Sequence, residues 1–209
     1  MQIFNDISPT IQIVSLLVSF IIALVIHEFF HAFSADRLGD PTAKLMGRLT
    51  LNPIVHFDLI GTLLPLFLII TRSPFVFGWG KPVIINPHNF KNPKLDNITV
   101  SLAGPMSNFA VAVIFGLLIR FIDLPIGLQY LFASIMIINL VFMVFNLIPI
   151  PPLDGSKILS LFISDRAYLV LQQFGIFLLL IFIMFVNFMP VISRIISFFF
   201  VIITGKTLL

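Results

Sequence analysis

The chain has 209 residues, of which 59% are hydrophobic and only 10% are charged, and its formal net charge is +3. Soluble globular domains carry about 25% charged residues, so this composition excludes an ordinary water-soluble globule and indicates a polytopic membrane protein. The positive charges are spread along the predicted loops and form no block of the kind that binds nucleic acid. The chain has no cysteine, which excludes disulfide bonds, thiolate metal ligands and a cysteine nucleophile.

The first predicted element is a long helix over residues 10–35. Residues 1–10 hold Asp6 but no Lys or Arg, so we expect no cleavable signal peptide at this end. The helix is almost purely apolar from Ile11 to Ile26, and residues 39–41 (Gly-Asp-Pro) end it. The length and hydropathy of this segment predict a membrane span.

Charge orients this first span. Arg37, Lys44 and Arg48 follow it, so the positive-inside rule places its carboxyl end toward the cytoplasm. From Ile11 to His27 the helix rises about 24 Å, at about 1.5 Å per residue. We therefore expect His27 to lie within the hydrocarbon layer, in its cytoplasmic third.

Three short segments follow before the next long helix. Residues 44–51 are mixed in character and end at Asn52-Pro53, which predicts a strand. Residues 58–70 are apolar, but about 13 residues cross a bilayer of about 30 Å only with difficulty. Residues 75–85 contain Gly78 and Gly80 and predict a glycine-cornered hairpin or re-entrant loop, which at membrane depth must be buried in protein or line a wet cavity.

The rest of the chain is dominated by apolar segments. Long helices are predicted at 97–121, 127–147 and 168–188, with a sixth apolar segment at 190–203. The fold class is therefore an all-α polytopic membrane protein of about six transmembrane helices, with a small re-entrant β-hairpin or sheet between helices one and three. We expect a single membrane-embedded domain over 1–209, with a catalytic core at about 10–165 and two additional helices in 166–209.

One short motif carries the chemistry. The only glutamate of the chain, Glu28, lies between two histidines in His27-Glu28-Phe29-Phe30-His31. Residues four apart share one face of a helix, so His27 and His31 can bind the same metal ion. This H-E-x-x-H pattern is the zinc-protease signature, in which the carboxylate handles a proton. A catalytic zinc site of this kind needs a third protein ligand besides water.

The third ligand stays open among His56, His88 and an aspartate, because the chain has no second glutamate. Asp154 is the strongest candidate, since it follows a proline-forced helix break between two long apolar segments. A carboxylate there costs on the order of 3 kcal/mol, and a metal ion would supply the compensating charge. His56 is expected to be structural or gating, with a substrate contact as an alternative, and His88 to be solvated.

Three segments resemble the hallmark motifs of the site-2 protease family of intramembrane zinc metalloproteases, in its compact prokaryotic branch without PDZ or CBS domains. They are HEFFH at 27–31, AGPMSN at 103–108 and NLIPIPPLDG at 146–155. The resemblance implies that His27, His31 and Asp154 bind one Zn²⁺ ion and that Glu28 is the catalytic carboxylate.

The same resemblance places Asn146 near the zinc. Its amide could donate a hydrogen bond to the oxyanion of the reaction, and a helix–helix hydrogen bond is the alternative. Gly104, Pro105 and Asn108 are expected to shape and pack the third helix.

The resulting hypothesis is an intramembrane zinc metalloendopeptidase. Water activated by zinc would attack a peptide bond within or near a transmembrane segment, with Glu28 as general base and then general acid. The partners would be membrane-protein substrates in the lipid bilayer of a prokaryotic cell membrane, with no nucleic acid and no predicted oligomeric state. The rival hypothesis is a metal carrier or transporter that uses the same histidines. The clustering of polar groups around one point favours the protease.

Overall fold

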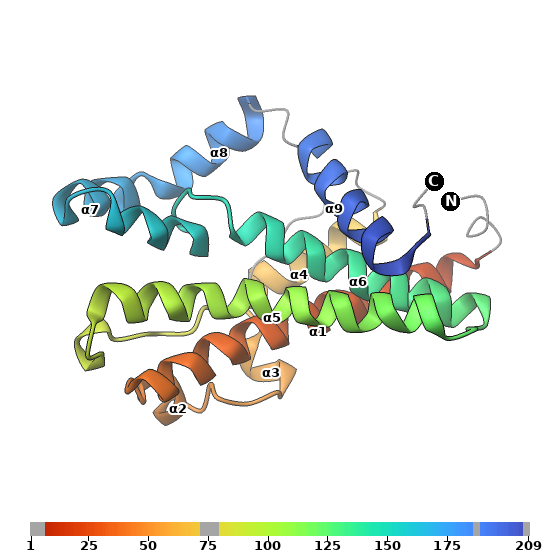
Figure 1. The fold of residues 1–209 in the computed structure, drawn as a ribbon, viewed down its shortest axis with the longest axis horizontal. Helices are drawn as coiled ribbons and strands as arrows, with labels where there is room; N and C mark the ends of the chain where they lie inside the picture. The colour runs from red at the N-terminus through yellow and green to blue at the C-terminus, as the bar shows by residue number, and fades with distance from the viewer. Residues whose placement is uncertain (1–6, 72–79, 186–188, 207–209) are drawn as a thin grey trace.

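Helices are the only regular secondary structure that the computed structural model describes, over residues 7–71, 80–185 and 189–206. Three long helices, α1 (Pro9–Leu38), α5 (Pro93–Phe121) and α6 (Ile126–Asn146), lie side by side and pack against one another (Figure 1). The shorter elements are α2 (Thr42–Leu45), α3 (Pro53–His56), α4 (Leu59–Ile70), η2 (Pro87–Asn89), η3 (Asp154–Leu161), α7 (Asp165–Gln173), α8 (Gly175–Phe185) and α9 (Met189–Thr204). The all-α class is confirmed.

Both ends of α1 follow from local sequence. The Ser8 side chain accepts a hydrogen bond from the Ile11 N–H, and Pro9 occupies the first turn, where its missing N–H costs nothing. Gly39 ends the helix at φ 107°, a left-handed conformation that favours glycine, and its N–H reaches the carbonyls of the last turn. The predicted break after the motif helix is confirmed.

Helix α9 packs across α5 and α6 and closes one side of the bundle (Figure 1). Gly116 of α5 allows this approach, because a Cβ there would lie 2.6 Å from Ile203 Cγ2 and 2.9 Å from Met136 Sδ. Small residues at such crossings let helix backbones come close within a membrane. The buried residues of this cluster are Ala112, Ile119, Ala133, Met136, Leu140, Met143, Ile192, Ile196, Phe200 and Ile203.

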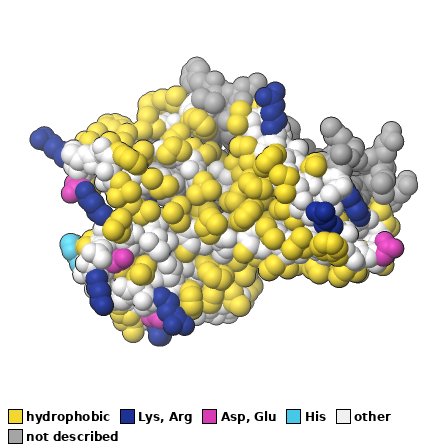
Figure 2. Space-filling model, in the orientation of Figure 1, with side chains coloured by type: hydrophobic (Ala, Val, Ile, Leu, Met, Phe, Trp, Pro, Cys, Tyr) yellow, Lys and Arg dark blue, Asp and Glu magenta, His cyan; other side chains and the backbone are white. Residues whose placement is uncertain are grey.

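Three described helices, α1, α5 and α6, are long and apolar enough to cross a membrane, or up to four spans if α7 and α8 count as one. That is fewer than the about six spans expected. Helices α4 and α9 have 12 and 16 residues, which is short for a bilayer. Hydrophobic side chains cover the central part of the face in Figure 2, and most charged side chains lie toward its two ends.

The segment expected as one helix over 168–188 is divided into two helices in the structure. Helices α7 and α8 meet at an angle of 65°. Helix α7 mixes charged and amide residues with apolar ones, whereas α8 is apolar throughout, so the two halves suit different surroundings. Gly175 sits at the bend against Pro151, where a Cβ would lie 2.8 Å from the Pro151 carbonyl oxygen.

The strand expected at 44–51 is also wrong. Its first residues belong to α2, Gly47 turns at φ 70°, and the Arg48 N–H donates to the Ala43 carbonyl at 2.8 Å. The backbone therefore bonds within the segment and needs no partner strand. Of the hairpin expected at 75–85, residues 75–79 lie outside the described residues, and residues 80–85 have no regular secondary structure and no strand partner in the described part.

Candidate metal centre

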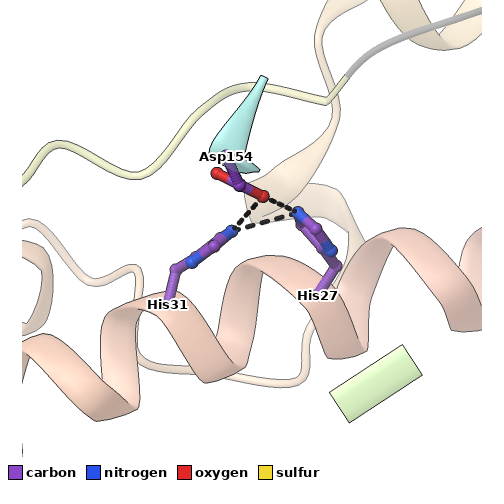
Figure 3. Close-up of side chains that lie close together, drawn as sticks. All are labelled: His27, His31 and Asp154. Carbon is purple, nitrogen blue, oxygen red and sulfur yellow. Dashed lines mark hydrogen bonds and ion pairs between the residues drawn. The ribbon is translucent and has the colours of Figure 1, made fainter. Parts of the chain in front are cut away.

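Three potential metal ligands from distant parts of the chain meet at one point. His27 and His31 project from one face of α1, and Asp154 reaches them from the start of η3 (Figure 3). The two Nε2 atoms are 3.0 Å apart, and Asp154 Oδ2 lies 3.1 Å from His27 Nε2 and 3.2 Å from His31 Nε2. Within the described chain these residues form a group that could hold a metal ion.

The turn after α6 determines where Asp154 lies. Short-range bonds fold it, from Ile150 N–H to the Ile148 carbonyl at 2.8 Å and from Leu153 N–H to the Ile150 carbonyl at 3.0 Å. Gly155 packs against the same turn, since a Cβ there would lie 2.5 Å from the Leu147 carbonyl carbon. Because these are backbone atoms, the residue after Asp154 must be glycine for the turn to close.

Hydrogen bonds on the far side of each ring set the imidazole tautomers. His31 Nδ1 faces the Val100 carbonyl oxygen at 2.8 Å, so it must donate. His27 Nδ1 faces Asn108 Oδ1 at 2.7 Å. The Asn108 amide nitrogen points the other way, to the Ala23 carbonyl and to Asn139 Oδ1, both at 2.9 Å.

Asn139 completes this chain of bonds. Its amide nitrogen donates to the Ile135 carbonyl at 2.8 Å, which turns its oxygen toward Asn108. Carbonyl acceptors thus orient both asparagines, and the Asn108 oxygen must accept from His27. Both asparagine side chains are fully buried. Bonds of this kind orient the histidine ligands of metal sites and raise their basicity.

The atoms that converge fit a divalent cation. When both imidazoles are neutral and donate from Nδ1, their Nε2 lone pairs point at Asp154 Oδ2, which has no hydrogen-bond partner among the described residues apart from its ion-pair contacts with these two rings. Three such acceptors repel one another unless positive charge lies between them. Their separations of 3.0–3.2 Å are close to the edge of a tetrahedron with zinc–ligand bonds of about 2.0–2.1 Å, which is about 3.3 Å.

Gly104 of α5 backs this group of ligands. A Cβ at this position would lie 2.7 Å from His31 Cε1 and 2.8 Å from His27 Cε1, with His31 Nε2 closer still. The absence of a side chain at Gly104 therefore lets both rings stand between α1 and α5.

Glu28 lies beside the group on α1 and is 9% exposed. Its Oε2 accepts a hydrogen bond of 3.1 Å from the backbone N–H of Val83. Val83 lies 55 residues after Glu28 in the sequence, in the segment that follows residue 80. Oε2 is therefore held in place by a backbone donor.

The other two histidine candidates are not part of this group. His56 is fully buried, with Nε2 at 2.8 Å from the Thr50 carbonyl, and His88 is exposed. Neither belongs to the metal-ligand group found in the described residues. Asn146 is half-buried at the end of α6, where its amide nitrogen donates to the Phe142 carbonyl at 3.0 Å.

Sequence reasoning missed one contributor, Asn139, and gave another, Asn108, a packing role. Asn139 was not singled out, although an isolated asparagine within an apolar helix is itself a signal, because its amide requires partners in a membrane. Asn108 was expected to pack a helix, and its bond to His27 depends on how α5 lies against α1. The contact between Glu28 and Val83 has no counterpart in any sequence pattern.

Comparison with known proteins agrees with this class of metal centre in an apolar helical bundle. The profile "Peptidase family M50" matches residues 123–189. "Putative zinc metalloprotease YwhC" of Bacillus subtilis is 41% identical over 154 residues, which cover 69% of this chain and 67% of that protein. "Putative zinc metalloprotease Rip2" of Mycobacterium tuberculosis is 32% identical over 175 residues, covering 80% and 66% respectively. No solved structure gives a significant match.

The chain thus spans about two thirds of the length of these relatives. It belongs to peptidase family M50, the site-2 protease family of zinc metalloproteases.

Proposed function

We propose that this protein is an intramembrane zinc metalloendopeptidase that hydrolyses peptide bonds within or near transmembrane segments of membrane proteins. The convergence of His27, His31 and Asp154 beside Glu28, on a helix of membrane-spanning length, is the observation that supports it most. In this proposal the three residues bind one Zn²⁺ ion. The catalytic core comprises about residues 10–165, and the helices of 166–209 are additional.

A bound zinc ion would supply Lewis acidity, which polarises a carbonyl group and makes water acidic enough to react near neutral pH. Glu28 takes a proton from the attacking water and delivers it to the leaving amine. The Val83 N–H bonds to Oε2, and we assign the proton exchange to Oε1, which does not carry this bond. His27 and His31 keep their Nδ1 protons throughout, because Asn108 and Val100 accept them.

Asn146 is the proposed donor to the oxyanion. One of its amide hydrogens already bonds to the Phe142 carbonyl, which leaves the other for a substrate. A positioned amide donor of this kind contributes about 10²–10³ in kcat. Its position at the end of α6, eight residues before Asp154, supports the assignment.

The substrate must present an extended backbone, because helical carbonyls are hydrogen-bonded and shielded. Residues 80–86 have no regular secondary structure, Val83 among them bonds to Glu28, and Ile84 is 54% exposed. We propose that an unwound substrate segment pairs with this stretch as an added strand. Membrane proteins in a prokaryotic cell membrane are the proposed substrates, cut toward the cytoplasmic side.

The substitution Glu28→Gln tests this function against metal transport. Gln has nearly the same size but cannot accept the proton, so cleavage should vanish while zinc binding remains. Purified protein in detergent is given tagged single-span substrates, and zinc content is measured in parallel. Transport that persists in Glu28→Gln, with no proteolysis by the wild type, would establish the transporter instead.

A further inference from the structure

Residues 80–86 form a segment without regular secondary structure, here called the strap, that lies along the motif helix. Three of its backbone N–H groups are bonded to elements outside it. Lys81 N–H donates to the His56 carbonyl at 2.8 Å, and Val83 N–H donates to Glu28 Oε2 at 3.1 Å. Asn86 N–H donates to Asp40 Oδ2 at 2.7 Å. The contact with Glu28 therefore lies between two anchors.

Asp40 is the anchor at the far end. Its carboxylate is fully buried just beyond the end of α1 and accepts four hydrogen bonds. Two come from the N–H and hydroxyl of Thr42, one from Asn86 N–H, and one from Asn89 Nδ2 at 2.7 Å. Burial alone would raise the pKa of Asp40, but these donors outweigh it and lower the pKa below its ordinary value. Asp40 thus ties α1 to the strap as a carboxylate.

The near anchor is the His56 carbonyl. His56 is held by its own bond to Thr50, and Arg48 donates to the carbonyl of the preceding Val55. The strap enters tightly here, because a Cβ on Gly80 would lie 2.5 Å from Leu24 Cδ1 and 3.2 Å from the His56 oxygen. Both anchors come from the polar connection between α1 and α4.

We propose that Asp40 is a positioning residue for Glu28. By holding Asn86, Asp40 keeps the strap against α1, so that the Val83 N–H stays on Oε2 and the carboxylate keeps one orientation. Asp40 lies twelve residues beyond Glu28 and outside the metal-ligand group. The inference rests on the proposed function, in which Glu28 transfers the proton.

Thiol labelling tests the strap without using activity, because the chain has no cysteine. Val83→Cys places one half-buried thiol on the strap. In that background, Asp40→Asn replaces one carboxylate oxygen by an amide NH2 group, which cannot accept the hydrogen bonds that Asp40 receives. The strap should loosen, and labelling of the thiol at position 83 by a water-soluble maleimide should become roughly tenfold faster. Asp36→Asn is the matched control, since Asp36 lies one turn earlier and pairs with Lys44 at 3.3 Å. It should leave the rate unchanged.

A second variant guards against misfolding. Asn89 is exposed, and Asn89→Ala removes its one hydrogen bond to Asp40, so the fold should be retained. The rate of thiol labelling should rise about threefold. With Val83 restored, Asp40→Asn should lower kcat for a tagged single-span substrate about tenfold. KM and zinc content should remain within about twofold of the wild type, a pattern that general unfolding would not produce.

The outcomes separate the two claims. Unchanged labelling in both Asp40→Asn and Asn89→Ala, in a protein whose wild type cleaves substrate, would refute the role of Asp40 alone. Faster labelling with unchanged kcat would also refute it, because the strap would then move without affecting Glu28. A wild type that cleaves no substrate would overturn the proposed function, and this inference with it.

Discussion

Replacing Gly104 by alanine should disrupt the metal centre from the side of α5. The added Cβ would lie 2.7 Å from His31 Cε1 and 2.8 Å from His27 Cε1, whereas carbon atoms normally pack at about 3.5–4.0 Å. The rings must therefore move by about 1 Å, and metal–ligand distances tolerate only about 0.2 Å. We expect zinc affinity to fall about 100-fold, which corresponds to about 2.7 kcal/mol.

Competition with a chelator of known zinc affinity measures this change in detergent-purified protein. Gly127→Ala is the matched control, because a Cβ at Gly127 of α6 meets no atom within 4 Å. The control should bind zinc as the wild type does, and helicity measured by circular dichroism should be equal in all three proteins. Zinc affinity of Gly104→Ala within about threefold of the wild type would contradict the geometry, since the rings would then have room to spare.

Three further predictions concern the surroundings of the ligands. Asn108→Ala should speed zinc dissociation about 10- to 100-fold, because His27 loses the acceptor that orients its ring; an unchanged off-rate would refute this role. Gly155→Ala should lower zinc content at least as much as Asp154→Ala, since the turn that presents the carboxylate cannot close; full zinc occupancy would contradict it. The lowered pKa of Asp40 stabilises the fold above about pH 4, and this contribution is lost as the pH falls further. The melting temperature should therefore fall less between pH 7 and pH 3 in Asp40→Asn than in the wild type. Equal falls in the two proteins would contradict this role of Asp40.

Long apolar helices were the most predictable part of the fold. The expected segments 10–35, 97–121 and 127–147 correspond to α1, α5 and α6, because a membrane helix satisfies its own backbone and needs only length and hydropathy. Short mixed segments were predicted poorly. Residues 44–51 resemble a strand in pattern, yet local hydrogen bonds fold them into α2 and a turn. At the bend between α7 and α8, Gly175 lies against Pro151, a contact that no local pattern reveals.

At the candidate site, sequence alone singled out the residues that can bind metal and move a proton. Spacing on a helix relates His27 to His31, and chemical rarity in an apolar chain marks Glu28 and Asp154. Their roles in binding and catalysis stay predictions. Only the tertiary structure decided which remote groups hold these side chains, such as Asn108 and the backbone of Val83. The physical reason is range: helix periodicity acts over one turn, whereas these bonds join residues 55 and 81 positions apart.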